Sequence, residues 1–172
     1  EIENVRLQLK WKHQFQFAGY YAAIEKGFYK DLGIRVDVIE AQPNEEPAIS
    51  VFNGNAEFGI STSDIILMRN SGYNPVILAA IFQHSPQILI TSSKSEINNI
   101  HQLKDKRIAL EPHAADIITY MADEGIKLSD CIITNHNFTV NQLIAGKVDA
   151  ITAYQTDEPF LLNEYKFEFG VI

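Results

Sequence analysis

The sequence predicts an α/β protein made of two units, and three observations support this. Short runs rich in β-branched residues alternate with segments of helical periodicity, which is typical of βα units and largely parallel sheets. The 172 residues are 46% hydrophobic and 21% charged, as in an ordinary globular protein of one large or two small domains. A polar stretch, 83–86, contains a proline and separates two apolar runs. We interpret it as a crossover between units 1–84 and 85–172, with a tight turn inside one sheet as the alternative.

In the first unit, apolar residues alternate with polar ones in some segments and recur at helical spacing in others. The expected strands are Val5–Trp11, Ile34–Ile39, Phe58–Ser61 and the apolar run Pro75–Phe82. The expected helices are Phe17–Tyr29 with Gly33 as its stop, one that starts between Pro43 and Pro47 and ends near Gly54, and one capped by Ser63 or Asp64 that runs to Met68 before Gly72.

The second unit repeats the alternation. The expected strands are Gln87–Thr91, Arg107–Leu110, Ile132–Phe138, Val148–Tyr154 and Phe167–Ile172. The expected helices are Ile100–Leu103, a helix opened by Pro112 and stopped at Gly125, Val140–Ala145 and Pro159–Tyr165.

Charge and cysteine content narrow the function classes. The net charge of −8 disfavours a nucleic-acid partner, because phosphate binding needs clustered Lys and Arg. Cys131 is the single cysteine, so neither an internal disulfide nor a Cys-rich metal site is expected. No apolar run approaches the roughly 20 residues that span a bilayer. The chain opens without a signal peptide, as a processed protein or an excised domain would.

Five segments resemble a family of substrate-binding proteins that includes thiamine-precursor and alkanesulfonate binders. They are Lys10-Trp11 followed by FAGYYAAIEKGFYKDLGI, then NGNAEFGISTSDIIL, AAIFQHSPQILI, KDKRIAL and GKVDAITAYQTDEPFLL. The resemblance implies the type II periplasmic-binding-protein fold, with two α/β lobes, crossover strands and ligand in the cleft. It also implies that lobe two, 85–172, ends where the chain would begin its return to lobe one. A shortened lobe one would expose apolar surface and favour a homodimer.

Several candidate ligand-binding residues of the first unit follow its strands. Trp11 ends the first strand, where an indole can stack on a flat heterocycle or lie in the core. Gln14 and Gln16 add amide groups, and Phe17 and Tyr20 add aromatic faces; many relatives have His where Phe17 stands. The junction after the third strand offers hydroxyl groups and a carboxylate, which cap the helix and face the presumed cleft: Ser61, Thr62, Ser63 and Asp64.

The crossover and the second unit supply the other candidates. Gln83 and His84 lie in the crossover, where a histidine contacts ligand, acts as a pH-sensitive hinge or has a structural role. Glu111 and His113 open a helix; a carboxylate there disfavours a sulfonate or phosphate and suits an aminopyrimidine or a cation. The last candidates are Tyr154, Asp157 and Glu158. The resemblance implies that an acidic residue of this segment faces the ligand, and Glu158 is the first choice, before Asp157. The alternative is that these acidic residues only mark the start of a helix.

The sequence thus predicts a non-enzymatic, periplasmic or extracytoplasmic module that binds a small, flat, nitrogenous or thiamine-precursor-like ligand without cofactor or metal. The expected partner is an ABC permease or a signalling domain that the module serves as sensor input. The alternative is an enzyme resembling the pyridoxal-phosphate-dependent synthases of the thiamine pyrimidine. Those enzymes carry a Cys-rich motif, and the single cysteine argues against that chemistry. Nucleophile-elbow, zinc-protease and phosphate-loop motifs are also absent from the sequence.

Overall fold

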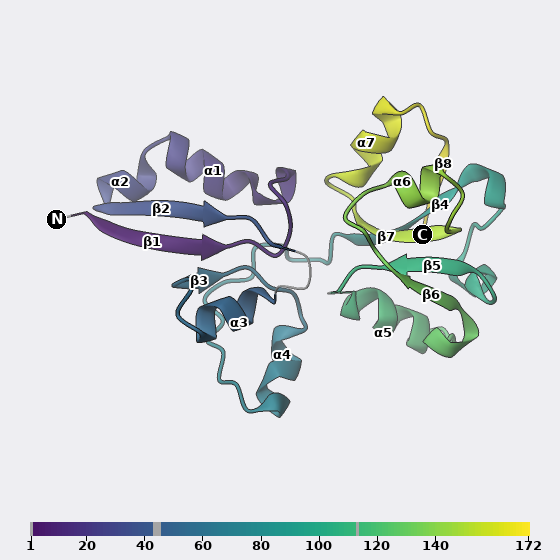
Figure 1. Ribbon diagram of the computed structural model, residues 1–172, viewed down its shortest axis with the longest axis horizontal. Helices are drawn as coiled ribbons and strands as arrows, with labels where there is room; N and C mark the ends of the chain where they lie inside the picture. Colours follow the sequence, from purple (N-terminus) through teal and green to yellow (C-terminus); the bar gives the residue numbers. More distant parts are fainter. Residues whose placement is uncertain (1, 43–45, 113) are drawn as a thin grey trace. The chain divides into compact units, whose positions relative to one another are not determined.

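The computed structural model describes residues 2–42, 46–112 and 114–172. The chain divides into two compact units, residues 1–78 and 79–172. This division falls six residues before the boundary that the sequence predicts. Each unit has its own sheet (Figure 1).

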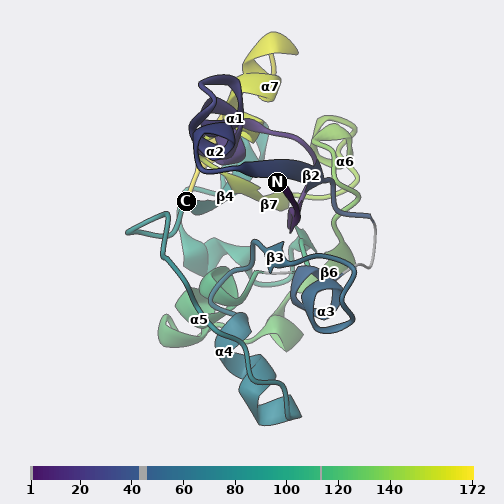
Figure 2. The same ribbon diagram turned by 90° about the vertical axis from the view of Figure 1, so that its left-hand side faces the viewer.

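The first unit is built on a parallel three-stranded sheet in the order β2-β1-β3. Its strands are β1 (Glu3–Gln8), β2 (Ile34–Ile39) and β3 (Phe58–Gly59), and its helices are α1 (Ala18–Glu25), α2 (Phe28–Asp31), α3 (Pro47–Phe52) and α4 (Ile65–Met68), with 3-10 turns at Phe15–Phe17 and Arg69–Ser71. The chain crosses from β1 to β2 on one side of β1 and then returns past β1 to β3. Right-handed crossovers therefore place α1 and α2 on one face of the sheet and α3 on the other (Figures 1 and 2).

The helix predicted over 17–29 is two helices, because Gly27 interrupts it. Gly27 has a φ of 76°, in the left-handed region that ends α1 and lets α2 start in a new direction. Gly33, at a φ of 74°, ends α2 as expected and leads into β2. The start of α3 at Pro47 also agrees with the prediction, whereas Pro43 lies outside the described residues.

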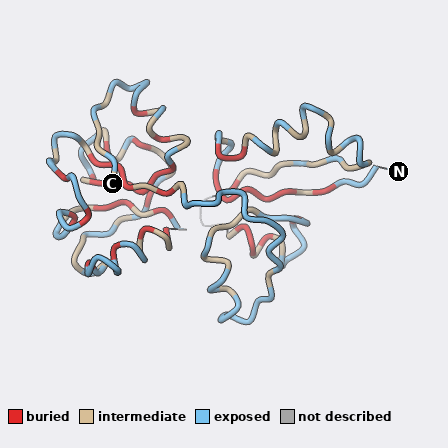
Figure 3. The backbone as a smooth tube through the Cα atoms, turned by 180° about the vertical axis from the view of Figure 1, so that it is seen from behind, coloured by how far each residue is buried: buried red, intermediate tan, exposed pale blue. Residues whose placement is uncertain are grey.

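The strand predicted at Pro75–Phe82 is wrong. The structure assigns no strand to these residues, and the segment is exposed from Val76, at 81%, to Phe82 (Figure 3). Its apolar, β-branched composition suits a strand, yet a strand forms only where a neighbour completes the hydrogen-bond ladder. Within the described part of the chain, β1 is the only strand that pairs with β3.

The second unit contains a five-stranded mixed sheet in the order β6-β5-β7-β4-β8. Its strands are β4 (Gln87–Ser92), β5 (Arg107–Leu110), β6 (Ile132–Asn135), β7 (Ala150–Tyr154) and β8 (Phe169–Val171); its helices are α5 (Ala115–Asp123), α6 (Asn141–Ile144) and α7 (Glu158–Glu164), with 3-10 turns at Ser93–Ser95, Ile100–Leu103 and Leu128–Asp130. β6, β5 and β7 run parallel, while β4 runs antiparallel to β7 and β8.

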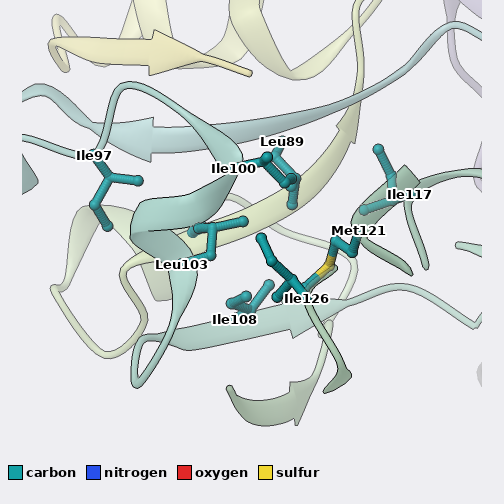
Figure 4. Packing of buried hydrophobic residues seen from close by; sticks show 9 residues of the cluster. Leu89, Ile97, Ile100, Leu103, Ile108, Ile117, Met121 and Ile126 are labelled. Carbon is teal, nitrogen blue, oxygen red and sulfur yellow. The ribbon is translucent and has the colours of Figure 1, made fainter. Parts of the chain in front are cut away.

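Successive residues of the central strands feed two separate hydrophobic cores, because side chains alternate between the faces of a sheet. Ile108 packs in a cluster with Met121 of α5 (Figure 4), whereas its neighbour Ala109 packs with Leu143 of α6 and Leu162 of α7. Both faces of the second sheet are therefore covered. The strands whose ends carry the acidic candidates are therefore packed on both sides.

Among the elements of the second unit, β6 and α5 differ most from their predicted bounds. β6 stops at Asn135 rather than Phe138, because Phe138 has a φ of 62° and cannot continue an extended strand. α5 begins at Ala115 rather than at Pro112. The candidate His113 lies outside the described residues.

Candidate functional site

The acidic candidates of the second unit lie at one edge of its sheet. β6, β5 and β7 are adjacent and parallel, so their carboxyl ends meet at the same edge, which is where open α/β sheets bind ligands. Glu111 follows β5, His136 follows β6, and the Tyr154–Glu158 segment follows β7. The antiparallel β4 starts at this edge, where Gln87 pairs with Tyr154.

Glu111 is a buried carboxylate held in place by two neighbouring strands. Its side chain is 6% exposed, and Gln87 Nε2 donates a hydrogen bond of 2.7 Å to its Oε1. Its backbone N–H donates to Thr152 Oγ1 of β7 at 2.8 Å. A charge-assisted hydrogen bond of this length orients the carboxylate before any ligand arrives.

Glu158 is the second buried carboxylate, at the first residue of α7. It is also 6% exposed, and its Oε2 accepts a 2.7 Å hydrogen bond from the backbone N–H of Tyr154. Burial raises the pKa of Glu158 to about 7, against the effect of that hydrogen bond, and the charges of Asp157 and Glu111 raise the pKa further. The charged groups that act on Glu158 are therefore carboxylates, so a cation or an N–H donor would relieve their repulsion.

Asp157 and Thr156 extend this acceptor-rich edge. Burial raises the pKa of Asp157, and its hydrogen bond with Glu158 opposes that shift. Asp157 Oδ2 and Thr156 Oγ1 are buried atoms, and neither has a hydrogen-bond partner among the described residues. The edge thus offers more oxygen acceptors than the described protein groups fill.

His136 is a buried residue of this edge that the sequence analysis did not select. Its Nδ1 accepts a 3.0 Å hydrogen bond from the N–H of Phe138, so the neutral ring carries its proton on Nε2. Burial lowers the pKa of His136 to about 4, which keeps the ring neutral at pH 7. The sequence predicts a strand that continues through His136 to Phe138. The position of His136 just after the end of β6 could therefore not be recognised from the sequence.

In the first unit, the loop that follows β1 is anchored by backbone and side-chain contacts. The N–H of Ala41 donates to the carbonyl of Trp11 at 3.1 Å, and the N–H of His13 donates to Glu40 at 2.9 Å. His13 Nδ1 also forms a hydrogen bond with the hydroxyl of Tyr21 on α1. These contacts fix the loop without using the amide groups of Gln14 and Gln16.

The aromatic candidates of the first unit differ in exposure. Trp11 is 4% exposed, and Phe17 is buried as well. Tyr20 is half-buried, and burial raises its pKa. A ring that stacks on a ligand needs an accessible face, and both Trp11 and Phe17 are covered. Their roles as stacking surfaces therefore stay predictions.

The junction after β3 is not capped as expected. Asp64 occupies the position before α4, yet its side chain makes no capping hydrogen bond to the described residues of that helix. Instead, Thr62 Oγ1 accepts from the N–H of Asp64 at 3.4 Å. Ser61, Thr62 and Asp64 are partly buried and Ser63 is exposed. The ligand contacts predicted for these four residues remain predictions.

The two crossover candidates are exposed. Gln83 Nε2 donates to the carbonyl of Ala80 at 2.9 Å, a contact within its own segment, and His84 is exposed beside it. Within its unit, then, the structure groups Glu111, Tyr154, Asp157 and Glu158 at one edge, whereas Gln83 and His84 lie on the exposed segment before β4.

No group of three or more His, Cys, Asp or Glu side chains in 2–42, 46–112 and 114–172 is arranged to hold a metal ion. In the same ranges, every helix is too short or too polar to cross a membrane.

A family model and a curated relative match nearly the whole chain. A family model described as "NMT1/THI5 like" matches residues 14–171. The riboflavin-binding protein RibY of Chloroflexus aurantiacus is 22% identical over 179 residues, which cover 99% of this chain and 51% of that protein.

Solved structures resemble the chain over nearly its whole length. A protein from Bordetella bronchiseptica RB50 matches 98% of this chain and 56% of its own, with a TM-score of 0.80 and 19% identity. The alkanesulfonate-binding protein SsuA from Xanthomonas axonopodis pv. citri, bound to MOPS, matches 99% of this chain and 60% of its own, with a TM-score of 0.77 and 16% identity. These likenesses confirm the type II periplasmic-binding-protein fold, and the chain spans about half the length of its curated relative.

Proposed function

The chain belongs to the NMT1/THI5-like family, and from this premise we propose that it is part of an extracytoplasmic solute-binding protein that captures a small, flat, nitrogenous ligand. One observation carries the proposal. Two buried and oriented carboxylates, Glu111 and Glu158, lie at the carboxyl ends of neighbouring parallel strands. They suit a ligand that brings N–H donors or a positive charge, such as an aminopyrimidine.

The same carboxylates argue against a sulfonate, although the SsuA relative was solved with MOPS. An anion at this edge would meet the carboxyl groups of Glu111, Asp157 and Glu158, each of which repels it when ionised. Like charges at close range cost several kcal/mol, in order of magnitude, in a poorly solvated site. A sulfonate would require these groups to be protonated, whereas an amino or amidinium group would be favoured by their ionisation.

Binding rather than catalysis is the proposed activity. Burial and the nearby Asp130 and Asp105 raise the pKa of Cys131, which disfavours the reactive thiolate. The enzyme alternative, a pyridoxal-phosphate-dependent pyrimidine synthase, is tested by adding pyridoxal phosphate. We expect no Schiff-base absorbance, and its appearance, together with its loss on borohydride reduction, would favour the enzyme.

The proposed partner is the permease of an ABC importer, as for the solved relatives whose names include an ABC transporter. A fused signalling domain is the alternative. A kinase or cyclase domain in the same full-length polypeptide would favour the sensor role.

A second copy of the chain is a further proposed partner. The segment 75–82 exposes Val76, Ile77 and Leu78 and carries no charge, so it would not repel a copy of itself. Sedimentation velocity is expected to show a dimer that Leu78→Lys dissociates. A monomer at all concentrations would contradict this proposal.

A thermal-shift screen tests the proposed ligand class. Riboflavin, thiamine, 4-aminopyrimidine, histidine and MOPS are compared at matched concentrations. A ligand that binds only the folded chain raises the free energy of unfolding by about 2.7 kcal/mol at a hundredfold excess over its Kd. We expect a nitrogenous heterocycle to give such a shift and MOPS to give none.

The matched variants are Glu158→Gln and Glu164→Gln, at the two ends of α7. Glu158 is buried at the acidic edge, and Glu164 is exposed. The shift should disappear in Glu158→Gln and persist in Glu164→Gln. A shift with MOPS alone, or one that both variants retain, would contradict the proposal.

A further inference from the structure

We infer that two copies of the chain join by exchanging the segment 75–82, which adds as an antiparallel strand to the edge of β3 in the other copy. The edge concerned is the one opposite β1. This inference rests on the proposed second copy and adds to it the way in which the two copies join. It does not depend on the ligand class proposed for the acidic edge.

The first step is a motif that both units contain. In the first unit, the N–H and Nη2 of Arg6 on β1 donate to Glu57, just before β3, at 2.7 and 2.6 Å. In the second unit, the N–H and Nη2 of Arg107 on β5 donate to Asp149, just before β7, at 2.8 and 2.7 Å. The N–H of each acidic residue donates back to the carbonyl of its arginine. With sheet orders β2-β1-β3 and β6-β5-β7, β3 therefore corresponds to β7.

The second step is what the two strands have beside them. β7 pairs with β5 on one side and with the antiparallel β4 on the other, from Gln87 opposite Tyr154 to Thr91 opposite Ala150. β3 pairs with β1, and the described part of the chain supplies no strand for its other edge. The unpaired N–H and C=O groups of such an edge are a template for a further strand. The motif of the second unit thus indicates that an antiparallel strand completes β3.

The third step is that the segment 75–82 has the composition of such a strand. It reads Pro-Val-Ile-Leu-Ala-Ala-Ile-Phe, with several β-branched and aromatic residues and no charge. Its proline stands at the first position, where a strand tolerates the missing N–H. β4, which fills the matching place beside β7, has a similarly apolar centre, and its Leu89 and Ile90 are fully buried. The segment 75–82, in contrast, is exposed from Val76 onwards.

The fourth step is the symmetry of the pairing. Two identical segments can lie antiparallel about a two-fold axis, and such an axis joins the same surface of both copies. Each segment 75–82 then has its counterpart on one side and β3 of the other copy on the other side. Both neighbours are antiparallel to it, as β7 and β8 are to β4. An uncharged segment brings no repulsion to this arrangement.

The first test compares Ala79→Pro with Ala79→Val. Ala79 is exposed, and its N–H donates to no acceptor among the described residues, so neither change should alter the monomer. Proline removes an N–H that a strand paired on both sides needs, whereas valine keeps it and suits a strand. Far-ultraviolet circular dichroism, at a concentration where the wild type is monomeric, checks that both variants fold.

Sedimentation velocity then measures the dissociation constant of the dimer. We expect Ala79→Pro to raise this constant at least about tenfold, because the inner ladder of hydrogen bonds is interrupted, and Ala79→Val to leave it unchanged or lower it. Equal dimerisation of the two variants would overturn the strand exchange while leaving a second copy that associates through side chains. A wild type that is monomeric at all concentrations would overturn the second copy as well.

Hydrogen exchange of the wild type, followed by mass spectrometry, tests the inference without any variant. It is measured well above and well below the dissociation constant of the dimer. We expect the amides of 58–61 and 76–82 to gain protection only in the dimer, and those of β6, the edge strand of the second sheet, to stay unchanged. Protection gained at β6 instead, or protection of 76–82 in the monomer, would overturn the inference.

Discussion

At the scale of single residues, Glu158 and His136 respond to pH in opposite directions. The pKa of Glu158 is about 7 in the folded chain and near its ordinary value of 4.5 in the unfolded chain. The folded chain thus holds the extra proton, and stability falls as pH rises from about 4.5 to about 7. The pKa of His136 is about 4 when folded and near 6.5 when unfolded, so its contribution to stability rises as pH rises through that interval.

We therefore expect the contributions of these two residues to offset each other between pH 4.5 and 6.5. In Glu158→Gln the histidine acts alone, and the variant should lose stability toward pH 4.5 relative to the wild type. In His136→Asn, whose amide oxygen can accept the Phe138 N–H, stability should instead fall toward pH 6.5. Each slope is at most about 1.4 kcal/mol per pH unit.

Urea unfolding at pH 4.5, 5.5 and 6.5 measures these slopes. Curves of stability against pH that run parallel in the wild type and both variants would contradict the assignment of the two pKa shifts.

The sequence predicted part of the residue-scale site. Glu111 was selected because it opens a predicted helix, and Glu158 because the family resemblance implies a ligand-facing acidic residue there. The structure places both at one sheet edge. His136 was missed because β6 was predicted too long. The exposure of Gln83 and His84 was not visible in the sequence, because it depends on whether the segment before β4 pairs with another strand. Whether the selected residues contact a ligand stays a prediction.

At the scale of elements, local patterns predicted boundaries well where the local chain decides them. β2 and β5 begin and end at the predicted residues, and so does the 3-10 turn Ile100–Leu103. Here β-branched runs are bounded by turn residues, and Asn99 closes a capping box at the turn. The strand predicted at Pro75–Phe82 failed because strand formation depends on a partner that lies elsewhere in space.

A pair of glycines tests the interpretation of the broken helix. Gly27 has a φ of 76°, so Gly27→Ala should lower the free energy of unfolding by about 1 kcal/mol through backbone strain. Gly19 lies inside α1, where an added Cβ meets no described atom within 4 Å. Gly19→Ala should raise that free energy by about 0.5–1 kcal/mol. Urea unfolding monitored by Trp11 fluorescence measures both, and equal effects of the two changes would contradict the interpretation.

At the scale of the whole molecule, the two units differ in how much core they have. Among the described residues, both clusters of buried hydrophobic side chains belong to the second unit. The first unit has a smaller sheet, and α1, α2 and α4 contain no buried residues. We therefore expect the first unit to unfold at a lower urea concentration than the second.

Trp11 makes this difference measurable, because it is the single tryptophan and belongs to the first unit. Its fluorescence should change at a lower urea midpoint than the far-ultraviolet circular dichroism, which reports helices and strands of both units. Coincident transitions would mean that the chain unfolds as one cooperative body, contrary to this expectation.

The central claim is that the chain binds a nitrogenous ligand through acceptors at the carboxyl ends of its parallel strands. Amide chemical-shift mapping by NMR during titration with 4-aminopyrimidine tests it most directly. The account predicts saturable shifts at Glu111 and 155–158, at the strand ends of the second unit. The absence of shifts, or shifts confined to residues remote from these strand ends, would contradict it.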